Sequence, residues 1–423
     1  MYDLVIRNGT VIDGTGSPSF QADIAIKEGK IVRIAKGISD GASVIDAAGL
    51  VVTPGFIDSH SHSDGSVFSS PEQREKIEQG ITTSIAGHCG ASPAPISRDI
   101  TPEKAKPVGD YGLNTEICRT FGSFAGTVKD VPQGSNIALL VGHSALRRAV
   151  MGIENRAPAD GEMEQMKNLL RDAMENGAMG LSFGLIYTPG CFAETEELIA
   201  LAKVVAGYHG IVTAHIRHEG ESLAQATEEF IRVLREAGVR GVLSHHKVMG
   251  WENWGKVTHT LRMMDEFNAQ GGEIYCDAYP YEASSSSLEP KFVLEKYRSY
   301  SMREALADPG VRRELRQWNL RKWGKRAEDL DWILLSYSEA YPQYAGKRIP
   351  EIAAIHGKDQ METVFDIIMG GRSNAFFFMM CPEDTEYVLK HPRTMICTDS
   401  GVSGGRNGVF HPRMTGSFPR VLG

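Results

Sequence analysis

Residues 55–64 read GFIDSHSHSD, and they place two histidines, His60 and His62, directly after a run of apolar and β-branched residues. Such a run predicts a buried β-strand. Because side chains alternate between the two faces of a strand, the two imidazoles would point the same way at its end. Two imidazoles so close together are typical of a metal chelate, which needs further ligands from elsewhere in the chain.

Apolar runs of this kind recur along the rest of the chain. The eight runs are GFIDSH at 55–60, ITTSIAGHC at 81–89, NIALLVGH at 136–143, AMGLSFGL at 178–185, GIVTAHIRH at 210–218, RGVLSHHK at 240–247, GEIYCDAYPY at 272–281 and TMICTDS at 394–400. Helical patterns that end at a glycine separate several of them, at 160–177, 194–210 and 222–238. Strands that alternate with helices predict a (β/α)8 barrel. An open doubly wound sheet is the alternative, but no glycine-rich phosphate turn follows an early strand.

Two stretches differ from this pattern. Residues 3–13 predict a pair of strands that turn at Asn8-Gly9, and residues 22–35 predict a second pair that turns at Glu28-Gly29-Lys30. We therefore expect a small β-sandwich portion at 1–52, ahead of a barrel domain at 53–423. Between about 283 and 375 the chain holds basic and aromatic helical material, and a barrel insertion of this length predicts a lid or a substrate wall.

The composition limits the partners of the chain. Its 45 Lys and Arg residues face 53 Asp and Glu residues, and no basic run carries interleaved aromatics, so we expect no nucleic-acid partner. The N-terminal residues lack a charged leader with an apolar core, and no apolar window is long enough to span a bilayer. These features predict a cytoplasmic protein without a membrane partner. They do not decide its oligomeric state.

Side chains that suit metal binding follow most of the predicted strands. The C-terminal ends of barrel strands meet at one mouth, where barrel enzymes hold their active sites. Imidazole, thiolate and carboxylate groups together make a zinc-type site. The candidates are His60 and His62, His88 and Cys89, His143, His215, His245 and His246, and Asp399. Cys89, His215 and His245 could hold one ion, and a second could lie between His60, His62 and Asp399.

The chain resembles the amidohydrolase superfamily, and within it the N-acyl-D-amino-acid deacylases (D-aminoacylases). The resemblance rests on GFIDSHSHSD, GHCGASPAP, TAHIRHEG, LSHHK, DAYPY, TDS and HPRMTGSFPRVLG, which occur in that order along the chain. It implies a distorted (β/α)8 barrel beside a small β-sandwich. It also implies zinc-dependent hydrolysis of the amide bond of an N-acyl-D-amino acid, and the preference for the D-enantiomer follows from the resemblance alone.

The resemblance further implies roles for single residues. Cys89, His215 and His245 match the ligands of a tightly held zinc, with the thiolate able to bridge two ions. A weaker second site matches His60, His62 and Asp399, and Asp399 also matches the general base. Many relatives bridge two metals through a carboxylated lysine on the fourth strand. The runs at 136–143 and 178–185 contain no lysine, which makes Cys89 the better candidate. Strand alternation selects His245 over His246.

Substrate-binding groups are implied in the same way. Arg413 and Lys247 match the cations that bind the substrate carboxylate, together with a tyrosine of DAYPY, either Tyr279 or Tyr281. Tyr187 matches a pocket wall. A final candidate, His143, could assist the oxyanion of the reaction, although a buried and hydrogen-bonded role is the commoner one for such a histidine.

Three functions other than amide hydrolysis of N-acyl-D-amino acids are each disfavoured by residues of this sequence. GISDG at 37–41 and GVSGG at 401–405 match the serine-hydrolase pattern GxSxG, but neither lies on a predicted strand-turn-helix. A cyclic-amide hydrolase of the dihydroorotase or hydantoinase kind is disfavoured by Cys89 and the missing lysine. A non-catalytic scaffold is disfavoured because all six candidate ligands are present.

The resemblance also makes a prediction for the end of the chain. Chains of the family continue beyond FPRVLG, which closes this sequence at residues 418–423. We therefore expect the eighth strand to lack its covering helix and the first β-unit to lack partner strands. Exposed apolar faces and open strand edges would result.

Overall fold

The computed structural model describes residues 1–97, 115–403 and 408–423. These residues form two compact units, Met1–Phe56 and Ile57–Gly423. The predicted boundary after residue 52 lies near this division.

The first unit is built on a five-stranded sheet. An antiparallel meander is formed by β1 (Tyr2–Val11), β2 (Phe20–Lys27) and β3 (Lys30–Ala35), and β1 also pairs in parallel with β4 (Gly41–Asp46) and β5 (Val51–Val52). The turn predicted at Glu28-Gly29 joins β2 to β3, with φ values of 52° and 72°. The sheet leaves Ile31, Ile45 and Val51 between 50% and 62% exposed.

The hairpin predicted at Asn8-Gly9 is wrong, because β1 runs through both residues. Asn8 has a φ of 60°, its N–H donates to Asp23 Oδ1 at 2.9 Å, and the register between β1 and β2 shifts between Ile6 and Gly9. These features describe a β-bulge. Asn and Gly adopt positive φ in bulges and in tight turns alike, so the residue pair alone does not distinguish them.

The second unit contains a parallel barrel whose strands coincide with the eight apolar runs. The strands are β6 (Phe56–Ser61), β7 (Ile81–Ala86), β8 (Asn136–Leu139) with its continuation β9 (Val141–Gly142), β10 (Gly180–Gly184), β11 (Ile211–His215), β12 (Arg240–Leu243), β13 (Ile274–Ala278) and β17 (Thr394–Ile396). They pair as β6-β7-β8 and as β9-β10-β11-β12-β13-β17. The ring closes where Asp399 N–H donates to His60 O at 2.9 Å and Ser61 bridges Ser400 in parallel. Every strand end therefore faces one mouth.

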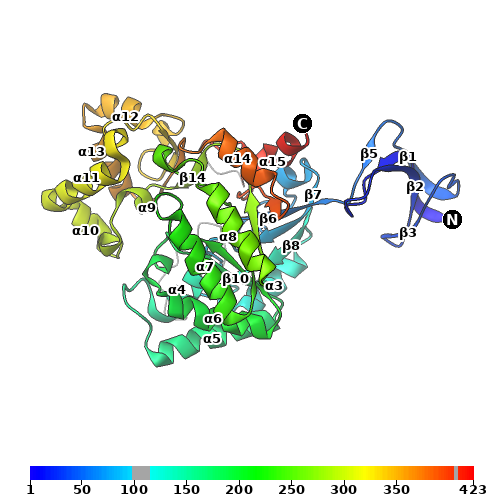
Figure 1. Ribbon diagram of the computed structural model, residues 1–423, viewed down its shortest axis with the longest axis horizontal. Coiled ribbons are helices and arrows are strands. Elements are labelled where there is room, and N and C mark those ends of the chain that lie inside the picture. The colour runs from blue at the N-terminus through cyan, green and yellow to red at the C-terminus, as the bar shows by residue number, and fades with distance from the viewer. Residues whose placement is uncertain (98–114, 404–407) are drawn as a thin grey trace. The chain divides into compact units, whose positions relative to one another are not determined.

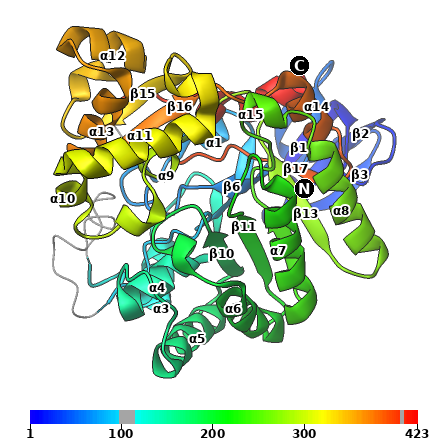
Figure 2. The ribbon, with the colours of Figure 1, turned by 60° about the vertical axis from the view of Figure 1, so that its left-hand side comes forward.

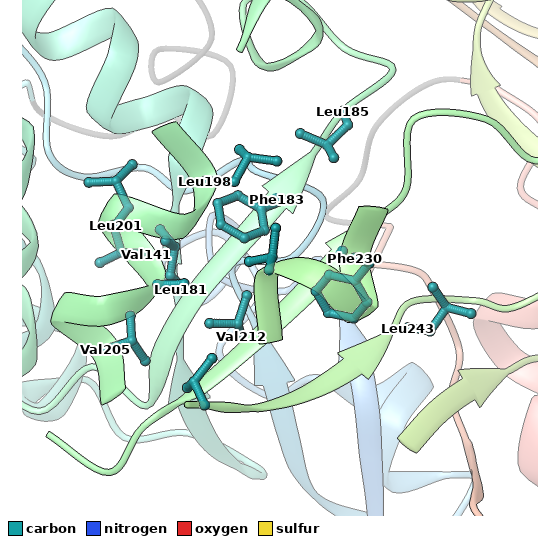
Figure 3. Packing of buried hydrophobic residues seen from close by; sticks show 14 of the residues in the cluster. Val141, Leu181, Phe183, Leu185, Leu198, Leu201, Val205, Val212, Phe230 and Leu243 are labelled. Atoms are coloured by element: carbon teal, nitrogen blue, oxygen red, sulfur yellow. The ribbon is translucent and has the colours of Figure 1, made fainter. Parts of the chain in front are cut away.

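Helices cover the outside of the barrel (Figures 1 and 2). They are α1 (Arg74–Ile77), α3 (Phe121–Asp130), α4 (His143–Met151), α5 (Asp160–Glu175), α6 (Thr195–Gly207), α7 (Leu223–Ala237), α8 (Val257–Ala269), α14 (Pro382–Leu389) and α15 (Arg413–Leu422). Figure 3 shows how the core forms between the two layers. Leu181 and Phe183 of β10 belong to one buried cluster with Leu198 and Leu201 of α6 and Phe230 of α7.

The insertion predicted near 283–375 is a separate substructure between β13 and β17. Its antiparallel sheet has the order β14-β16-β15, with β14 at Ser284–Ser287, β15 at Ile333–Ser338 and β16 at Ser373–Phe377. Its helices are α9 (Glu289–Phe292), α10 (Met302–Ala307), α11 (Pro309–Trp323), α12 (Ile349–His356) and α13 (Gln360–Met369). Trp332, Phe365 and Phe377 belong to its own apolar core. Figure 2 shows its helices grouped apart from α5 and α6.

A helix does follow the eighth strand, against the sequence prediction. α15 packs on α1, and the Gln79 side chain beside α1 donates to Met414 O at 2.7 Å and accepts from Phe418 N–H at 3.2 Å. Within the described ranges, every helix is too short or too polar to cross a membrane.

Candidate metal centre

The side chains predicted as metal ligands meet at the C-terminal mouth of the barrel. His60 lies near the end of β6, and His215 is the last residue of β11. Cys89, His245 and Asp399 follow β7, β12 and β17, and all three have positive φ, at 55°, 37° and 44°. Such a backbone costs a non-glycine residue about 1–3 kcal/mol and persists where its surroundings enforce it. The chain is bent at these positions in a way that turns the side chains into the mouth.

The backbone of Cys89 lies directly against β10. A Cβ atom on Gly184 would lie 1.9 Å from Cys89 O, and one on Gly90 would lie 2.7 Å from Gly184 N. Glycine is therefore required on both sides of this contact, and the contact fixes the position of the thiol.

Three imidazoles surround the Cys89 thiol. Sγ lies 3.4 Å from His60 Nε2, 3.4 Å from His245 Nε2 and 3.6 Å from His215 Nδ1. A tetrahedral zinc about 2.3 Å from sulfur and about 2.0–2.1 Å from nitrogen separates these atoms by about 3.6 Å. All four side chains are buried. The spacing and the soft donor set both fit zinc.

Asp399 completes this group from the side of β17. Its Oδ1 lies 3.5 Å from His60 Nε2 and 3.2 Å from His62 Nε2, and its Oδ2 accepts from Arg413 Nη1 at 2.6 Å. His62 is the least enclosed candidate, with a side chain 32% exposed. Four side chains offer ligand atoms within 4.8 Å of one another: His60, Cys89, His245 and Asp399.

Two carboxylates behind the histidines were missed by the sequence reasoning. Asp277 of β13 lies 3.2 Å from His60 Nδ1. Glu219, four residues after His215, lies 3.4 Å from His215 Nε2 and 3.3 Å from His245 Nδ1. Each of these three imidazoles thus turns one nitrogen toward Cys89 and the other toward a carboxylate, the arrangement that orients metal-binding histidines.

The protonation states also suit metal binding. Burial lowers the pKa of His60 well below its usual range and that of His245 to about 3, so both imidazoles are neutral. Burial raises the pKa of the Cys89 thiol, which keeps the thiol protonated until a cation binds beside it and displaces the proton. Burial would also raise the pKa of Asp399, but the Arg413 guanidinium holds it well below its ordinary value.

The metal-binding group opens into a cavity of about 1030 Å³ that is shared by the barrel mouth and the insertion. Tyr187, Lys247, Tyr279 and Arg413 line it, together with the serines of β14. Arg413 and Lys247 lie over the ring of Tyr279, at 4.6 and 5.8 Å from its centroid. The cavity therefore carries two cations beside one tyrosine.

Four of the sequence candidates lie elsewhere among the described residues. His88 stacks on the ring of His60 at 3.9 Å between centroids, and its Nδ1 lies 3.3 Å from Thr213 Oγ1. Tyr281 is not part of the cavity lining, and its hydroxyl donates to Pro412 O at 3.4 Å. His143 lies in α4 with Nε2 2.7 Å from Glu197 Oε1, which is the buried structural role rather than an oxyanion contact. His246 Nε2 lies 3.0 Å from the Thr260 hydroxyl of α8, outside the mouth.

Neither GxSxG match has the geometry of a nucleophile elbow. GISDG at 37–41 joins β3 to β4 in the first unit, whose described residues form strands and loops without a helix. In GVSGG at 401–405, Ser403 Oγ donates to Glu75 Oε1 at 2.5 Å, and residues 404–405 lie outside the described residues. The serine mechanism has no support from this geometry.

Comparison with known proteins agrees with this site. The model of the amidohydrolase family matches residues 43–300. The D-aminoacylase of Alcaligenes xylosoxydans xylosoxydans is 34% identical over 424 residues, which cover 100% of this chain and 78% of that protein. An N-acyl-D-glutamate deacylase of the same organism is 35% identical with the same coverage.

A solved structure shares the fold over the whole chain. It is the N-acyl-D-glutamate deacylase of Bordetella bronchiseptica, complexed with zinc and with a phosphonate inhibitor that mimics the tetrahedral intermediate of its reaction. It is 33% identical with a TM-score of 0.85, covering 100% of this chain and 80% of that one.

The barrel and the donor set define a hydrolase of the metal-dependent barrel class. The chain belongs to the amidohydrolase family, and within it to the N-acyl-D-amino-acid deacylases, or D-aminoacylases. The predicted fold, a TIM-like barrel with an N-terminal β-sandwich, is confirmed by this membership.

Proposed function

We propose that this chain hydrolyses the amide bond of N-acyl-D-amino acids to a carboxylate and a free D-amino acid, with zinc as its cofactor. The observation that carries the proposal is the Cys89 thiol, which lies 3.4–3.6 Å from three imidazole nitrogens in the barrel mouth. Relatives that match the full length of the chain are D-aminoacylases and N-acyl-D-amino-acid deacylases.

The candidate ligands at the barrel mouth form two groups, one for each of two ions. Cys89, His215 and His245 would hold one zinc tightly, and a weaker second ion would lie toward His60, His62 and Asp399. Bound zinc supplies Lewis acidity toward the scissile carbonyl and lowers the pKa of water. Three of these ligands come from loops held in strained backbone conformations, so the site is formed before the ion arrives.

Asp399 would move the proton of the reaction. Its carboxylate is ionised and can accept a proton from the attacking water, then pass that proton to the leaving amine. The Arg413 hydrogen bond occupies Oδ2 and leaves Oδ1 directed toward His60 and His62.

The cavity would orient the substrate through its carboxylate. Lys247 and Arg413 supply a point charge and a planar fork for this group, and both lie over the ring of Tyr279. Burial raises the pKa of Tyr279 to about 12, so its hydroxyl stays protonated and can donate. Tyr187 would form the opposite wall, where its hydroxyl lies 3.1 Å from Ser286 Oγ.

Zinc content and amine release test the proposal together. We expect about one or two zinc ions per chain and faster amine release from N-acetyl-D-methionine than from its L-enantiomer. Asp399→Ala should abolish this release. A zinc-loaded chain that cleaves neither enantiomer would contradict the proposal, and a dihydroorotate or hydantoin assay would then test the cyclic-amide alternative. A well-folded chain that binds no zinc would favour the non-catalytic scaffold.

A further inference from the structure

Glu219 contacts both the metal-binding group and a cation of the cavity. It lies after β11 and is 8% exposed. Oε2 lies 3.4 Å from His215 Nε2, and Oε1 lies 3.3 Å from His245 Nδ1. The same Oε1 lies 2.6 Å from Lys247 Nζ. One carboxylate therefore faces two imidazoles and an ammonium group at once.

The two imidazoles face Cys89 through different nitrogens. His215 turns Nδ1 toward the thiol, and His245 turns Nε2 toward it. A histidine that binds a metal through one nitrogen carries its proton on the other. The proton would then be on Nε2 of His215 and on Nδ1 of His245, and Glu219 presents an oxygen to each of these atoms. Lys247 Nζ also lies 2.9 Å from His245 Nδ1, so Glu219 shares that nitrogen with an ammonium group. Glu219 therefore favours the tautomer that leaves the nitrogen near Cys89 free most directly in His215, and it acts on His245 together with Lys247.

Glu219 is itself held in place by the backbone. Met249 N–H, from the loop after β12, donates to Glu219 O at 2.7 Å. Lys247 also donates to the carbonyl oxygen of His245 at 2.9 Å. The carboxylate is therefore tied to the loops that follow both β11 and β12.

We propose that Glu219 is a positioning residue that couples the metal centre to the site for the substrate carboxylate. It orients two zinc-binding histidines and, with one of the same oxygens, fixes the ammonium group of Lys247. The carboxylate-binding part of this inference rests on the proposed function. Because coupling between two sites is reciprocal, bound zinc should strengthen the binding of the substrate carboxylate, and Glu219 should carry part of that effect.

A direct metal-ligand role for Glu219 is the competing interpretation. His215, Glu219 and His245 do offer ligand atoms within 4.8 Å of one another. However, Lys247 Nζ lies 2.6 Å from one oxygen and Lys291 Nζ lies 3.8 Å from the other. Two ammonium groups at this distance repel a third cation, which favours the positioning role.

Glu219→Gln is the decisive variant, and the chain offers a matched control. Glu197 is also buried and also faces a histidine, with Oε1 2.7 Å from His143 Nε2, but it lies on α6 outside the cavity. Zinc affinity is measured by competition with a chelator, without substrate. KM and kcat are then measured with N-acetyl-D-methionine at saturating zinc. Thermal melting of each zinc-loaded variant shows whether it is folded.

We expect Glu219→Gln to bind zinc about 10- to 100-fold more weakly than the wild type, with a raised KM and a folded chain. Glu197→Gln should keep the zinc affinity and the KM of the wild type, even if it melts earlier. Glu219→Asp retains the charge on a shorter side chain and should recover part of the zinc affinity.

Two results would overturn the inference. One is a Glu219→Gln variant with the zinc affinity of the wild type, and the other is an equal loss of zinc affinity in Glu219→Gln and Glu197→Gln. If the wild type binds zinc but cleaves no N-acyl-D-amino acid, the proposed function fails, whereas the zinc affinities of the variants still decide whether Glu219 positions the histidines.

Discussion

Asp399 combines an ionised carboxylate with a place beside the metal-binding group. Arg413 donates to Oδ2, and Oδ1 faces His60 and His62 within the metal-binding group, where it can take a proton. We expect Asp399→Asn to lower kcat by about 10²- to 10⁴-fold, because an amide of the same shape cannot accept that proton. Steady-state kinetics with N-acetyl-D-methionine measures the loss.

Zinc content distinguishes this loss from damage to the site. Cys89, His215 and His245 are unchanged in Asp399→Asn, so the variant should still bind the tightly held ion. A variant that retains zinc and more than a tenth of the wild-type kcat would rule out Asp399 as the general base.

Residue type and strand position together predicted which side chains would meet at the barrel mouth. Histidine, cysteine and aspartate are rare enough at strand ends that their recurrence in Cys89, His215 and Asp399 was informative. Glu219 carried no such signal, because glutamate is common in surface loops and its role depends on distances. Tyr279 and Tyr281 were not separable either, since both lie beyond the last residue of β13, where strand alternation no longer applies.

At the scale of elements, α1 joins the first and last strands of the barrel through one buried lysine. Lys76 Nζ donates to Asp58 Oδ2 at 2.7 Å, to Thr398 Oγ1 at 2.6 Å and to Ser400 O at 2.8 Å. Lys76→Met would leave the buried Asp58 charge without its partner. We expect it to lower the free energy of unfolding by about 3–5 kcal/mol, measured by urea denaturation.

An exposed ion pair gives the control for this prediction. Lys390 pairs with Glu386 on the surface, where both side chains are more than 60% exposed. Lys390→Met should leave the urea midpoint almost unchanged. Equal midpoints for Lys76→Met and Lys390→Met would show that the buried pair does not stabilise the barrel.

A second buried pair connects α4 to α6 and gives a pH-dependent prediction. Burial would raise the pKa of Glu197, but His143 and Arg147 hold it below its ordinary 4.5. Its contribution to stability is thus present above pH 4.5 and is lost as pH falls through the lower, folded-state pKa. Glu197→Gln should therefore destabilise the chain at pH 7 and at pH 5, and differ less from the wild type below pH 4. A difference that grows as the pH falls would contradict this assignment.

The barrel strands were predictable from the sequence, whereas strand β14 of the insertion was not. Parallel strands covered by helices are buried on both faces, which is why each appeared as a continuous apolar run. β14 escaped prediction because its sequence is Ser284–Ser287, and it forms a strand through its pairing with β16 rather than through any propensity of serine. Contacts between distant segments of this kind leave no pattern in a single stretch of sequence.

At the scale of the whole chain, the metal-binding group connects distant parts of the barrel. Its side chains lie at or just after the ends of β6, β7, β11, β12 and β17, which are five of the eight strands. An ion that binds the folded barrel and not the unfolded chain stabilises the fold by mass action. Zinc at 1,000 times its dissociation constant would contribute about 4 kcal/mol. Removal of zinc should therefore lower the melting temperature of the unit Ile57–Gly423.

For a unit of this size, that free energy corresponds to a melting temperature about 5 °C lower after chelation. Calorimetry with and without a chelator measures the shift. The first unit, Met1–Phe56, contains none of the ligands, so a separate transition from it should not move. Cys89→Ala provides the control, because it removes the thiol at the centre of the donor set and should melt at the same temperature with and without zinc. If the wild type also melted at one temperature under both conditions, the ion would not connect these strands.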